Sequence, residues 1–509
     1  MNGAKPLWLR FLAASAAGAL CAWIAPPTSW HWLHWFAWLP VFWALKPDDT
    51  KGNIAVGWVF GTFALGLIFG WVAPTIALYS NIPGPVSFLL LLLGAGIVFG
   101  WIYVPAFLAV HPLRRAWGAW WVLLFPFVLV ANEFVVSRIL IFPWQMGVAH
   151  YQVPAVFQIA SVTGVWGVSW LVALVNAALA EVMFRRLEDR PFPTSAVAGA
   201  LALWSINAIW GVQRFNTVEA ELRQAKVVRI AQLQSPHDMV FRMSNRPDMA
   251  FREWVVRTRR LPAGSADIVV WPEGASPFDM QSGRHSRLAG ILAKQGQFEM
   301  VIGGGTRVRA DDAEGPRFEQ FNSVFYYDLD GNLAARYDKM VPLVFGEYLP
   351  TGLNWLHNFV QGIGDFRAGT DPVVYRGTHA NVSSPICYEA IFASICRQYK
   401  GSNLLINVTN DAWFGDTSAS HLHGMLAAIR ATELGITVFR SAYSGTSFVV
   451  EPHGNIHAQT PLFVEVARVV PVRLATVPTL YARFGDWFPW LCLLVVFGLA
   501  AVNPWRKSN

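Results

Sequence analysis

The sequence predicts two structural parts in one chain, a multi-span α-helical membrane domain and a layered α/β domain that faces water. Hydrophobic residues make up 54% of the 509 positions and charged residues only 14%, against roughly 25% charged residues in a typical soluble domain. The apolar residues are concentrated in residues 1–213 and in one stretch near the C-terminus, whereas the middle carries most of the acids and short apolar runs. We therefore expect a membrane domain at 1–213, a water-facing domain at 214–478, and a last span with a cytoplasmic tail at 479–509.

About eight segments are long and apolar enough for membrane helices, since a span needs about 20 apolar residues. They are Leu7–Ile24, Trp30–Leu45, Ile54–Tyr79, Val86–Val110, Trp117–Val136, Ile159–Phe184, Thr194–Val212 and Trp487–Val502. Lys5 and Arg10 precede the first span as in a signal peptide, but the next span follows almost at once, so we interpret it as a membrane helix. The apolar stretch Ile139–Val156 contains Pro143 and Pro154, and we expect it to be re-entrant or to lie on the membrane surface.

Basic residues between the spans predict the orientation, because Lys and Arg stay on the cytoplasmic side. If the spans alternate, one side receives Lys5, Arg10, Lys46, Lys51, Arg114, Arg115, Arg185, Arg186, Arg190, Arg506 and Lys507. The other side has short loops with few basic residues, of which Arg138 is the main one. Both termini are then cytoplasmic, and residues 214–478 lie in the periplasm of a Gram-negative cell. The net charge of +7 is explained by these flanking residues, so we expect no nucleic acid as a partner.

Residues 214–478 alternate between strand and helix patterns, which is typical of a layered α/β domain. The expected strands are Val227–Gln232, Asp267–Trp271, Met300–Gly303, Ser323–Asp328, Asn381–Cys387 and Leu404–Val408. The expected helices are Met249–Arg259, Ser286–Gln295 and His423–Leu434.

Four cysteines are present, and none of them belongs to a CxxC pair. Cys21 and Cys492 lie inside apolar segments, whereas Cys387 and Cys396 lie in the water-facing part. A bridge between Cys387 and Cys396 stays open as an alternative that no spacing favours.

Three segments place reactive side chains at the ends of strand-like runs, where α/β folds assemble their sites. They are Trp-Pro-Glu273-Gly, Tyr-Asp-Lys339 and Ile-Cys387-Tyr-Glu389. Taken singly, a Cys after an apolar run is more often an inert core residue, and a Lys beside an Asp is usually a solvated pair. Taken together they are chemically coherent. A thiolate is a nucleophile, a carboxylate can take its proton, and an ammonium can stabilise an oxyanion.

These segments resemble the Glu-Lys-Cys triad segments of the nitrilase, or carbon–nitrogen hydrolase, superfamily. Three further motifs resemble one branch of it, the apolipoprotein N-acyltransferase family. They are FGEYLP at 345–350, NVTNDAWFGD at 407–416 and TLYARFGDWF at 479–488. The order of seven spans, an outer domain and a final span is similar as well, so the resemblance covers nearly the whole chain. It implies a nitrilase-like αββα sandwich for residues 214–478.

The resemblance also implies a two-step acyl transfer as the last step of lipoprotein maturation. Cys387 takes an acyl chain from a phospholipid as a thioester, and the α-amine of the N-terminal diacylglyceryl-cysteine of an apolipoprotein then accepts it. By motif match Glu273 is the base and Lys339 the oxyanion partner. Three residues support the site, and three more contact substrate. The supporting residues are Glu347, Tyr388 and Glu389, and the substrate-binding residues are Phe241, Phe345 and Trp413. No cofactor and no metal is implied, and we expect a monomer in the membrane.

Some positions depart from the family pattern. Phe241 takes the position of an expected Trp, Pro342 lies two positions early, and Tyr443 replaces an expected Asn. The triad is unchanged, so the departures concern the substrate more than the reaction. Three alternatives stay open: an acyltransferase with another lipid donor or a different amine acceptor, a membrane-anchored amidase in which water replaces the amine, and a transporter or scaffold. Phe345 and Trp413 could equally pack the domain core, and His421 with His423 lacks further ligands for a metal.

Overall fold

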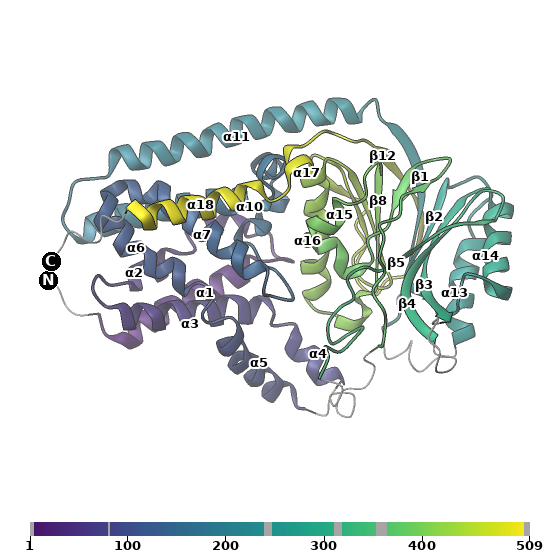
Figure 1. The fold of residues 1–509 in the computed structure, drawn as a ribbon, viewed down its shortest axis with the longest axis horizontal. Helices are drawn as coiled ribbons and strands as arrows, with labels where there is room; N and C mark the ends of the chain where they lie inside the picture. Colours follow the sequence, from purple (N-terminus) through teal and green to yellow (C-terminus); the bar gives the residue numbers. More distant parts are fainter. Residues whose placement is uncertain (1–4, 80–81, 239–246, 310–317, 353–363, 503–509) are drawn as a thin grey trace. The chain divides into compact units, whose positions relative to one another are not determined.

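The computed structural model describes residues 5–79, 82–238, 247–309, 318–352 and 364–502. The chain divides into two compact units, Met1–Phe215 with Arg483–Asn509, and Asn216–Ala482 (Figure 1). The first unit is helical and the second contains two sheets with helices. Each unit is described below by itself.

Apolar helices build the first unit. They are α1 (Leu7–Ile24), α2 (Leu39–Ala44), α3 (Thr50–Ile68), α4 (Val72–Tyr79), α5 (Gly84–Val98), α6 (Val104–Trp117), α7 (Trp121–Ser137), α8 (Pro154–Phe157), α9 (Ala160–Thr163), α10 (Val165–Leu187), most of α11 (Thr194–Leu222) and α18 (Trp487–Val502). Within the described residues, five helical stretches are long and apolar enough to cross a membrane, with α6 and α7 taken as one, and three shorter apolar segments accompany them. The chain is thus a multi-helical membrane protein by length and composition.

Several of the expected spans are not continuous helices, and Ile159–Phe184 is one of them, since Gly164 separates α9 from α10. Trp30–Leu45 contains a 3-10 turn at His31–Trp35 and then the short α2, in whose first turn a proline lies. Ile54–Tyr79 divides into α3 and α4 around a turn that includes Gly70. Val86–Val110 divides into α5 and α6 because α6 starts afresh with a proline in its first turn. Apolar composition therefore predicted where the helices are but not where they break.

Most of the stretch Ile139–Val156 is buried within its unit, whereas Ile139 and Ile141 are exposed, and its re-entrant or membrane-surface position stays a prediction. Its centre forms a 3-10 helix at Met146–Gln152, and residues 143–150 are all buried. Two backbone N–H groups of this segment find side-chain acceptors, since Met146 donates to Glu133 and Gly147 to Ser169, both at 2.9 Å. Non-helical backbone is tolerated among apolar helices only where it is buried in protein with its polar groups bonded.

Close helix packing in this unit depends on small residues and paired charges. A Cβ added to Gly18 of α1 would lie 2.8 Å from the backbone nitrogen of Ala64 in α3, so only glycine lets these helices approach so closely. Buried Arg10 bonds the carbonyl of Ala44 at 2.6 Å and pairs with Asp49. Polar groups inside this unit therefore hold helices to each other.

Two six-stranded sheets form the described part of the second unit, in the orders β12-β1-β2-β3-β4-β5 and β11-β10-β9-β8-β7-β6. Their strands are β1 (Lys226–Gln234), β2 (Ile268–Ser276), β3 (Glu299–Arg309), β4 (Phe318–Tyr327), β5 (Leu333–Asp338), β6 (Tyr375–Arg376), β7 (Asn381–Ser383), β8 (Leu404–Thr409), β9 (Thr437–Ala442), β10 (Phe448–Val450), β11 (Ile456–His457) and β12 (Val466–Leu474). The β1-β2-β3 and β7-β8-β9 pairings are parallel, and the remaining pairings are antiparallel.

The two sheets pack face to face, with β2 against β8 and β9, and helices cover their outer faces. Helices α13 (Pro247–Arg259) and α14 (Gly283–Gly296) lie on the first sheet, and α16 (Ala419–Leu434) lies on the second. The short helix α15 (Ala393–Cys396) packs with α16. This layering is the αββα sandwich that the resemblance implied.

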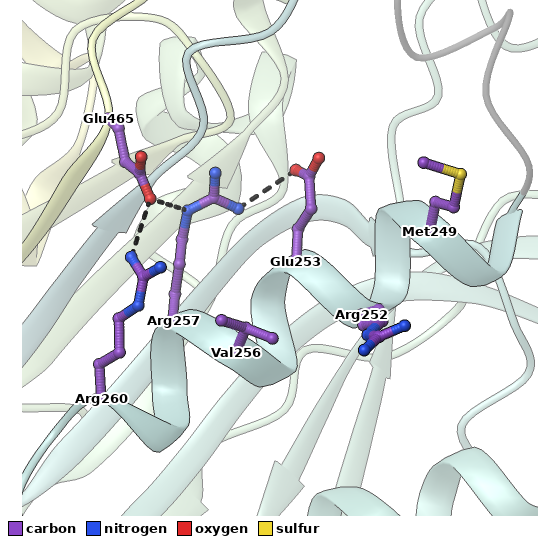
Figure 2. A pocket seen from close by; sticks show the side chains of 7 residues that line it. All are labelled: Met249, Arg252, Glu253, Val256, Arg257, Arg260 and Glu465. Atoms are coloured by element: carbon purple, nitrogen blue, oxygen red, sulfur yellow. Dashed lines mark hydrogen bonds and ion pairs between the residues drawn. The ribbon is translucent and has the colours of Figure 1, made fainter.

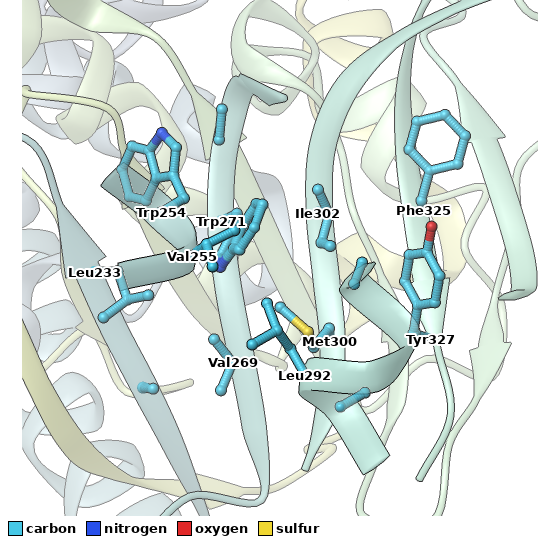
Figure 3. Packing of buried hydrophobic residues seen from close by; sticks show 14 of the residues in the cluster. Leu233, Trp254, Val255, Val269, Trp271, Leu292, Met300, Ile302, Phe325 and Tyr327 are labelled. Carbon is cyan, nitrogen blue, oxygen red and sulfur yellow. The ribbon is translucent and has the colours of Figure 1, made fainter. Parts of the chain in front are cut away.

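A core of apolar and aromatic side chains lies between α13, α14 and the first sheet, as Figure 3 shows. Trp254 of α13 and Trp271 of β2 are fully buried there, with ring centroids 6.4 Å apart. Trp271 also donates its indole N–H to the hydroxyl of Thr258 at 2.9 Å. Burying such large rings stabilises each layer by about 25 cal/mol for each Å² of apolar surface, so the strand that carries Glu273 has a rigid base.

Candidate active site

The three predicted triad residues lie on different elements of the second unit. Glu273 lies on β2, Lys339 directly follows β5, and Cys387 begins a 3-10 helix at Cys387–Ile391. The expected strand Asn381–Cys387 is shorter than predicted, since β7 ends at Ser383. Pro385 cannot donate a backbone hydrogen bond to a sheet, and the chain leaves the ladder before the cysteine.

Glu273 is a buried carboxylate with partners on three other elements. Its Oε1 lies 3.6 Å from Nζ of Lys339 and accepts from the side-chain amide of Asn322 at 2.7 Å. Its Oε2 accepts from the backbone N–H of Asn410 at 2.7 Å. Both oxygens are thus oriented by donors from distant segments. A carboxylate fixed in this way can exchange a proton with a neighbour without first being desolvated.

Lys339 is only 1% exposed, and its ammonium lies 2.7 Å from Oε2 of Glu347. Burial alone would lower the pKa of Lys339, but the carboxylates of Glu347 and Glu273 raise it well above its usual value. Lys339 therefore stays charged in this site. A second carboxylate, Glu347, is needed to balance that charge while Glu273 serves another role.

The thiol of Cys387 is buried, and its pKa is raised by desolvation first and by the charge of Glu273 second, while Lys339 acts in the opposite direction. The resting group is therefore a neutral thiol. Its backbone has φ +50°, a left-handed conformation that is uncommon for a residue with a side chain. All four cysteines are free, so the Cys387–Cys396 bridge is not formed.

Glu389 holds the turn that contains the cysteine. Its carboxylate accepts from the backbone N–H groups of Ile386 at 2.8 Å, Met340 at 2.6 Å and Val341 at 3.0 Å. The hydroxyl of Tyr337 donates to both of its oxygens at 2.8 Å. Burial raises the pKa of Glu389 to about 7, while the charge of Lys339 and these donors lower it. The residue connects the segment after Lys339 to the segment before Cys387.

The predicted substrate contacts are less uniform. Phe345 is 45% and Trp413 37% exposed, so the alternative that both pack the domain core is wrong. Phe345 lies at the tip of a tight turn with φ +64°, closed by its N–H to the carbonyl of Tyr348 at 2.9 Å. Tyr388 is buried, with its ring 4.8 Å from that of Phe392. Phe241 lies outside the described residues, so its predicted role stays a prediction.

Sequence reasoning missed Asn322 as a site residue. Its side-chain nitrogen donates to Glu273 at 2.7 Å and to Glu347 at 2.6 Å, and so holds both carboxylates. It lies in the middle of β4, where nothing in the local pattern marks it. The available signal in the sequence was a polar residue within a strand. The structure places this residue beside the Lys339 segment, since the Lys339 N–H donates to the Asn322 carbonyl at 2.9 Å.

Of the two histidines considered for a metal, His423 already has a protein partner. Nδ1 of His423 lies 2.9 Å from Asp411. Among the described residues, one acidic group with a histidine could hold an ion, formed by Glu219, Glu451 and His453. Both carboxylates already pair with the guanidinium of Arg473, at 3.1 Å and 2.6 Å. A cation already occupies the position between them.

A shallow pocket lies on α13, and Figure 2 shows the side chains that line it. Arg257 bridges Glu253 and Glu465, each at 3.2 Å, and Arg260 lies 3.5 Å from Glu465. None of its lining residues belongs to the motifs, and its charges largely neutralise each other. The triad remains the better candidate for chemistry.

Comparison with known proteins places this geometry in a family context. Residues 17–178 match the model of the apolipoprotein N-acyltransferase N-terminal domain, and residues 228–480 match that of carbon–nitrogen hydrolases. The chain is 30% identical to the apolipoprotein N-acyltransferase of Geobacter metallireducens, over 98% of this chain and 96% of that protein. It is 27% identical to that of Allorhizobium ampelinum, over 97% of this chain and 96% of that protein.

Solved structures with a similar fold come from the nitrilase superfamily. One is an amidase from Nesterenkonia sp. AN1, 19% identical with a TM-score of 0.37, matched over 48% of this chain and 90% of that chain. Another is a branch 10 member from Saccharomyces cerevisiae, 17% identical with a TM-score of 0.38, matched over 56% and 96%.

Proposed function

Because this chain belongs to the apolipoprotein N-acyltransferase family, we propose that it moves an acyl chain from a phospholipid to an apolipoprotein, the last step of lipoprotein maturation. The acceptor is the α-amine of the N-terminal diacylglyceryl-cysteine. The observation that supports the proposal is the buried pair of Glu273 and Lys339, 3.6 Å apart, in the same α/β unit as the buried thiol of Cys387. The periplasm is the proposed site of the reaction, as the distribution of basic residues predicts.

In the first step Glu273 takes the proton of the Cys387 thiol as sulfur attacks the ester carbonyl of the phospholipid. The C–S bond forms, and the carbonyl oxygen becomes an oxyanion that the Lys339 ammonium stabilises. The intermediate then collapses by breaking the ester C–O bond. Glu273 returns the proton to the departing oxygen, so a lysophospholipid leaves and the acyl chain remains on Cys387 as a thioester.

In the second step the α-amine of the apolipoprotein attacks the thioester carbonyl. Glu273 accepts a proton from the amine, and Lys339 stabilises the second oxyanion. The C–S bond breaks, the thiolate of Cys387 recovers its proton from Glu273, and an amide is released. Atoms and charges balance in both steps without a cofactor. The second step proceeds because a thioester is more reactive toward amines than the ester from which it formed.

The exposed rings of Phe345 and Trp413 support a lipid substrate. Each is a large apolar side chain that the fold leaves partly in solvent, and Phe345 is held there by its turn. Exposed aromatic rings contribute apolar contact area at low conformational cost. We propose that they contact acyl chains at the entrance to the thiol.

The experiment that tests the acceptor starts from protein loaded with a palmitoyl thioester. A diacylated lipopeptide with a free α-amine is added, and the loaded protein is followed by intact mass. Its control is the same lipopeptide with an acetylated amine. We expect the free amine to discharge the thioester and to gain the acyl chain, and the acetylated peptide to leave the thioester in place. If the thioester is lost equally fast in water without the lipopeptide, the protein is a membrane-anchored amidase and the proposed transfer is wrong.

A further inference from the structure

The left-handed backbone of Cys387 must be held by its surroundings, because an L side chain rarely adopts φ +50° without external restraint. Glu389 restrains the turn from one side through the N–H of Ile386 at 2.8 Å. A restraint on the other side has to act on the carbonyl groups, which a carboxylate cannot bind. The side chain in that position is Asn407 of β8.

Asn407 is fully buried, and its side-chain nitrogen donates to two carbonyls that flank the turn. The bond to Pro385 is 2.9 Å long, and the bond to Cys387 itself is 3.4 Å long. The carbonyl of Cys387 belongs to the same residue as the nucleophilic sulfur. A shift of this amide would therefore rotate the backbone from which the sulfur projects.

An amide can turn over and present its oxygen instead of its nitrogen, and the partner on its other side decides which atom points to the turn. Nη1 of Arg440 donates to Oδ1 of Asn407 at 2.6 Å. Because a guanidinium has only hydrogen-bond donors, Arg440 can bind the oxygen of the Asn407 amide but not its nitrogen. Arg440 and Asn407 are also register partners on the parallel strands β9 and β8, which places both side chains on one face.

Arg440 is itself fixed in place. It is fully buried, its Nη2 lies 2.6 Å from Oδ2 of Asp411, and its Nε donates to the carbonyl of Thr446 at 3.2 Å. Asp411 is bonded in turn by Ser420 at 2.7 Å. A planar guanidinium that is bound by Asp411 and by the Thr446 carbonyl orients its remaining partner, Asn407, more narrowly than a lysine could.

We propose that Asn407, oriented by Arg440, is a positioning residue that fixes the backbone of Cys387 so that its sulfur faces Glu273. Neither residue takes a proton or touches the acyl group. The inference deepens the proposed function, since it concerns the same nucleophile, and its test must separate failure of the positioning from failure of the acyl donor.

The test compares Asn407→Asp in the full-length protein in detergent with a matched control, Asn381→Asp. The carboxylate introduced by Asn407→Asp would keep the contact with Arg440 but would turn an acceptor toward the two carbonyls. Asn381 lies on β7 of the same sheet and also donates its amide to a carbonyl, that of Gly401 at 3.2 Å, away from the turn. Thermal unfolding of both variants establishes that they are folded.

The first measurement is acyl loading of Cys387 from dipalmitoyl phosphatidylethanolamine at several lipid concentrations. We expect Asn407→Asp to lower the saturating rate about 100-fold, as small misplacements of reacting groups do, with the half-saturating lipid concentration unchanged. Asn381→Asp should load at the wild-type rate. Arg440→Lys should fall between the two, because it keeps the charge beside Asp411 but loses a fixed donor to the amide.

The second measurement does not depend on lipid. Alkylation of Cys387 by iodoacetamide is followed by peptide mass for wild type, Asn407→Asp, Glu273→Gln and the double variant. If Asn407 acts by directing the sulfur to Glu273, the double variant should react no more slowly than the slower single variant. If the two substitutions slow alkylation by factors that multiply in the double variant, or if Asn407→Asp reacts at the wild-type rate, the inference is wrong. If the wild-type protein takes no acyl chain from the lipid but the alkylation rates still show this coupling, the phospholipid is not the acyl donor. The positioning role of Asn407 would then still hold.

Discussion

The thiol of Cys387 enters the reaction protonated, because burial and the neighbouring charge of Glu273 both raise its pKa. Lys339 acts in the opposite direction, but its charge is shared with Glu347 at 2.7 Å. The site therefore differs from a resting thiolate–cation pair. In the proposed mechanism the sulfur of Cys387 therefore becomes reactive only as its proton moves to Glu273.

The pH dependence of alkylation tests this coupling. A raised pKa means that the thiolate fraction of Cys387 at neutral pH is below that of free cysteine, whose pKa is about 8.5. We expect its reaction with iodoacetamide to be slower than that of free cysteine at about pH 8 and to rise with pH without levelling off below about pH 9. A rate that is already constant between about pH 6 and 8 would show a preformed thiolate and contradict this description.

Asn322 offers a second residue-scale test, because one side-chain nitrogen holds both Glu273 and Glu347. Asn322→Ala removes a hydrogen bond to a charged group, which is worth roughly 1.5–3 kcal/mol. We expect acyl loading of Cys387 to slow by about 10- to 100-fold, measured by intact mass over time. Asn332→Ala, in the exposed turn between β4 and β5, should load normally. Equal rates in the two variants would remove Asn322 from the site.

The residues of the candidate site could be predicted from the sequence where they lie in a recognisable local motif. Glu273, Lys339 and Cys387 each stand in a short motif at the end of an apolar run. Asn322 and Asn407 do not, because each sits inside a strand and acquires its partners only when strands distant in sequence come together. The exposure of Phe345 and Trp413 was likewise undecided, since an aromatic ring suits a core and a surface equally.

At the scale of elements, Arg473 of β12 connects three parts of the second unit. Its guanidinium pairs with Glu451, after β10, at 2.6 Å and with Glu219, at the end of α11, at 3.1 Å. Burial alone would raise the pKa of Glu451, but the neighbouring His457 and the guanidinium of Arg473 lower it to about 2. This pairing stabilises the edge strand against the neighbouring sheet.

Removing Arg473 should therefore destabilise the fold. Arg473→Met leaves the buried Glu451 without its main partner, and we expect a loss of about 3 kcal/mol in the free energy of unfolding near pH 7. A lowered carboxyl pKa contributes stability above the unfolded value of about 4.5 and loses it as pH falls toward 2. The difference between wild type and variant should shrink over that range.

Urea unfolding of the full-length protein in detergent, followed by tryptophan fluorescence, measures this difference. Arg223→Met is the control, because Arg223, just after α11, is largely exposed and pairs with Glu219 at 3.3 Å. A loss of stability in Arg473→Met that stays constant down to about pH 3 would mean that Glu451 is not the group responsible.

Element positions were largely predictable, but their ends were not. Apolar runs located the helices of the first unit, and shorter strand-like runs located β1, β2, β3, β4, β7 and β8. The breaks depended on single residues such as Pro40, Gly70 and Pro385, whose effect on the backbone is local and strong. Strands β5, β6, β9, β10, β11 and β12 were missed. Of these, β6, β10 and β11 have only two or three residues, and β5 and β12 lie at sheet edges.

At the scale of the whole molecule, the apolar helices make this a membrane protein, and the basic residues predict which side each part faces. The prediction can be tested by labelling introduced cysteines, since all four native cysteines are buried. Arg287→Cys lies on the exposed face of α14, and Arg186→Cys is exposed near the end of α10. We expect a membrane-impermeant maleimide to label position 287 in spheroplasts, and position 186 only after permeabilisation. The reverse pattern would place the catalytic unit in the cytoplasm.

The central claim is that Cys387 carries the acyl chain as a thioester. Purified full-length protein is incubated with dipalmitoyl phosphatidylethanolamine and examined by intact mass and by peptide mass at Cys387. We expect a palmitoyl adduct on Cys387 that hydroxylamine removes, no adduct in Cys387→Ala, and much slower loading in Glu273→Gln. Absence of an adduct in the wild-type protein, or its persistence in Cys387→Ala, would contradict the account.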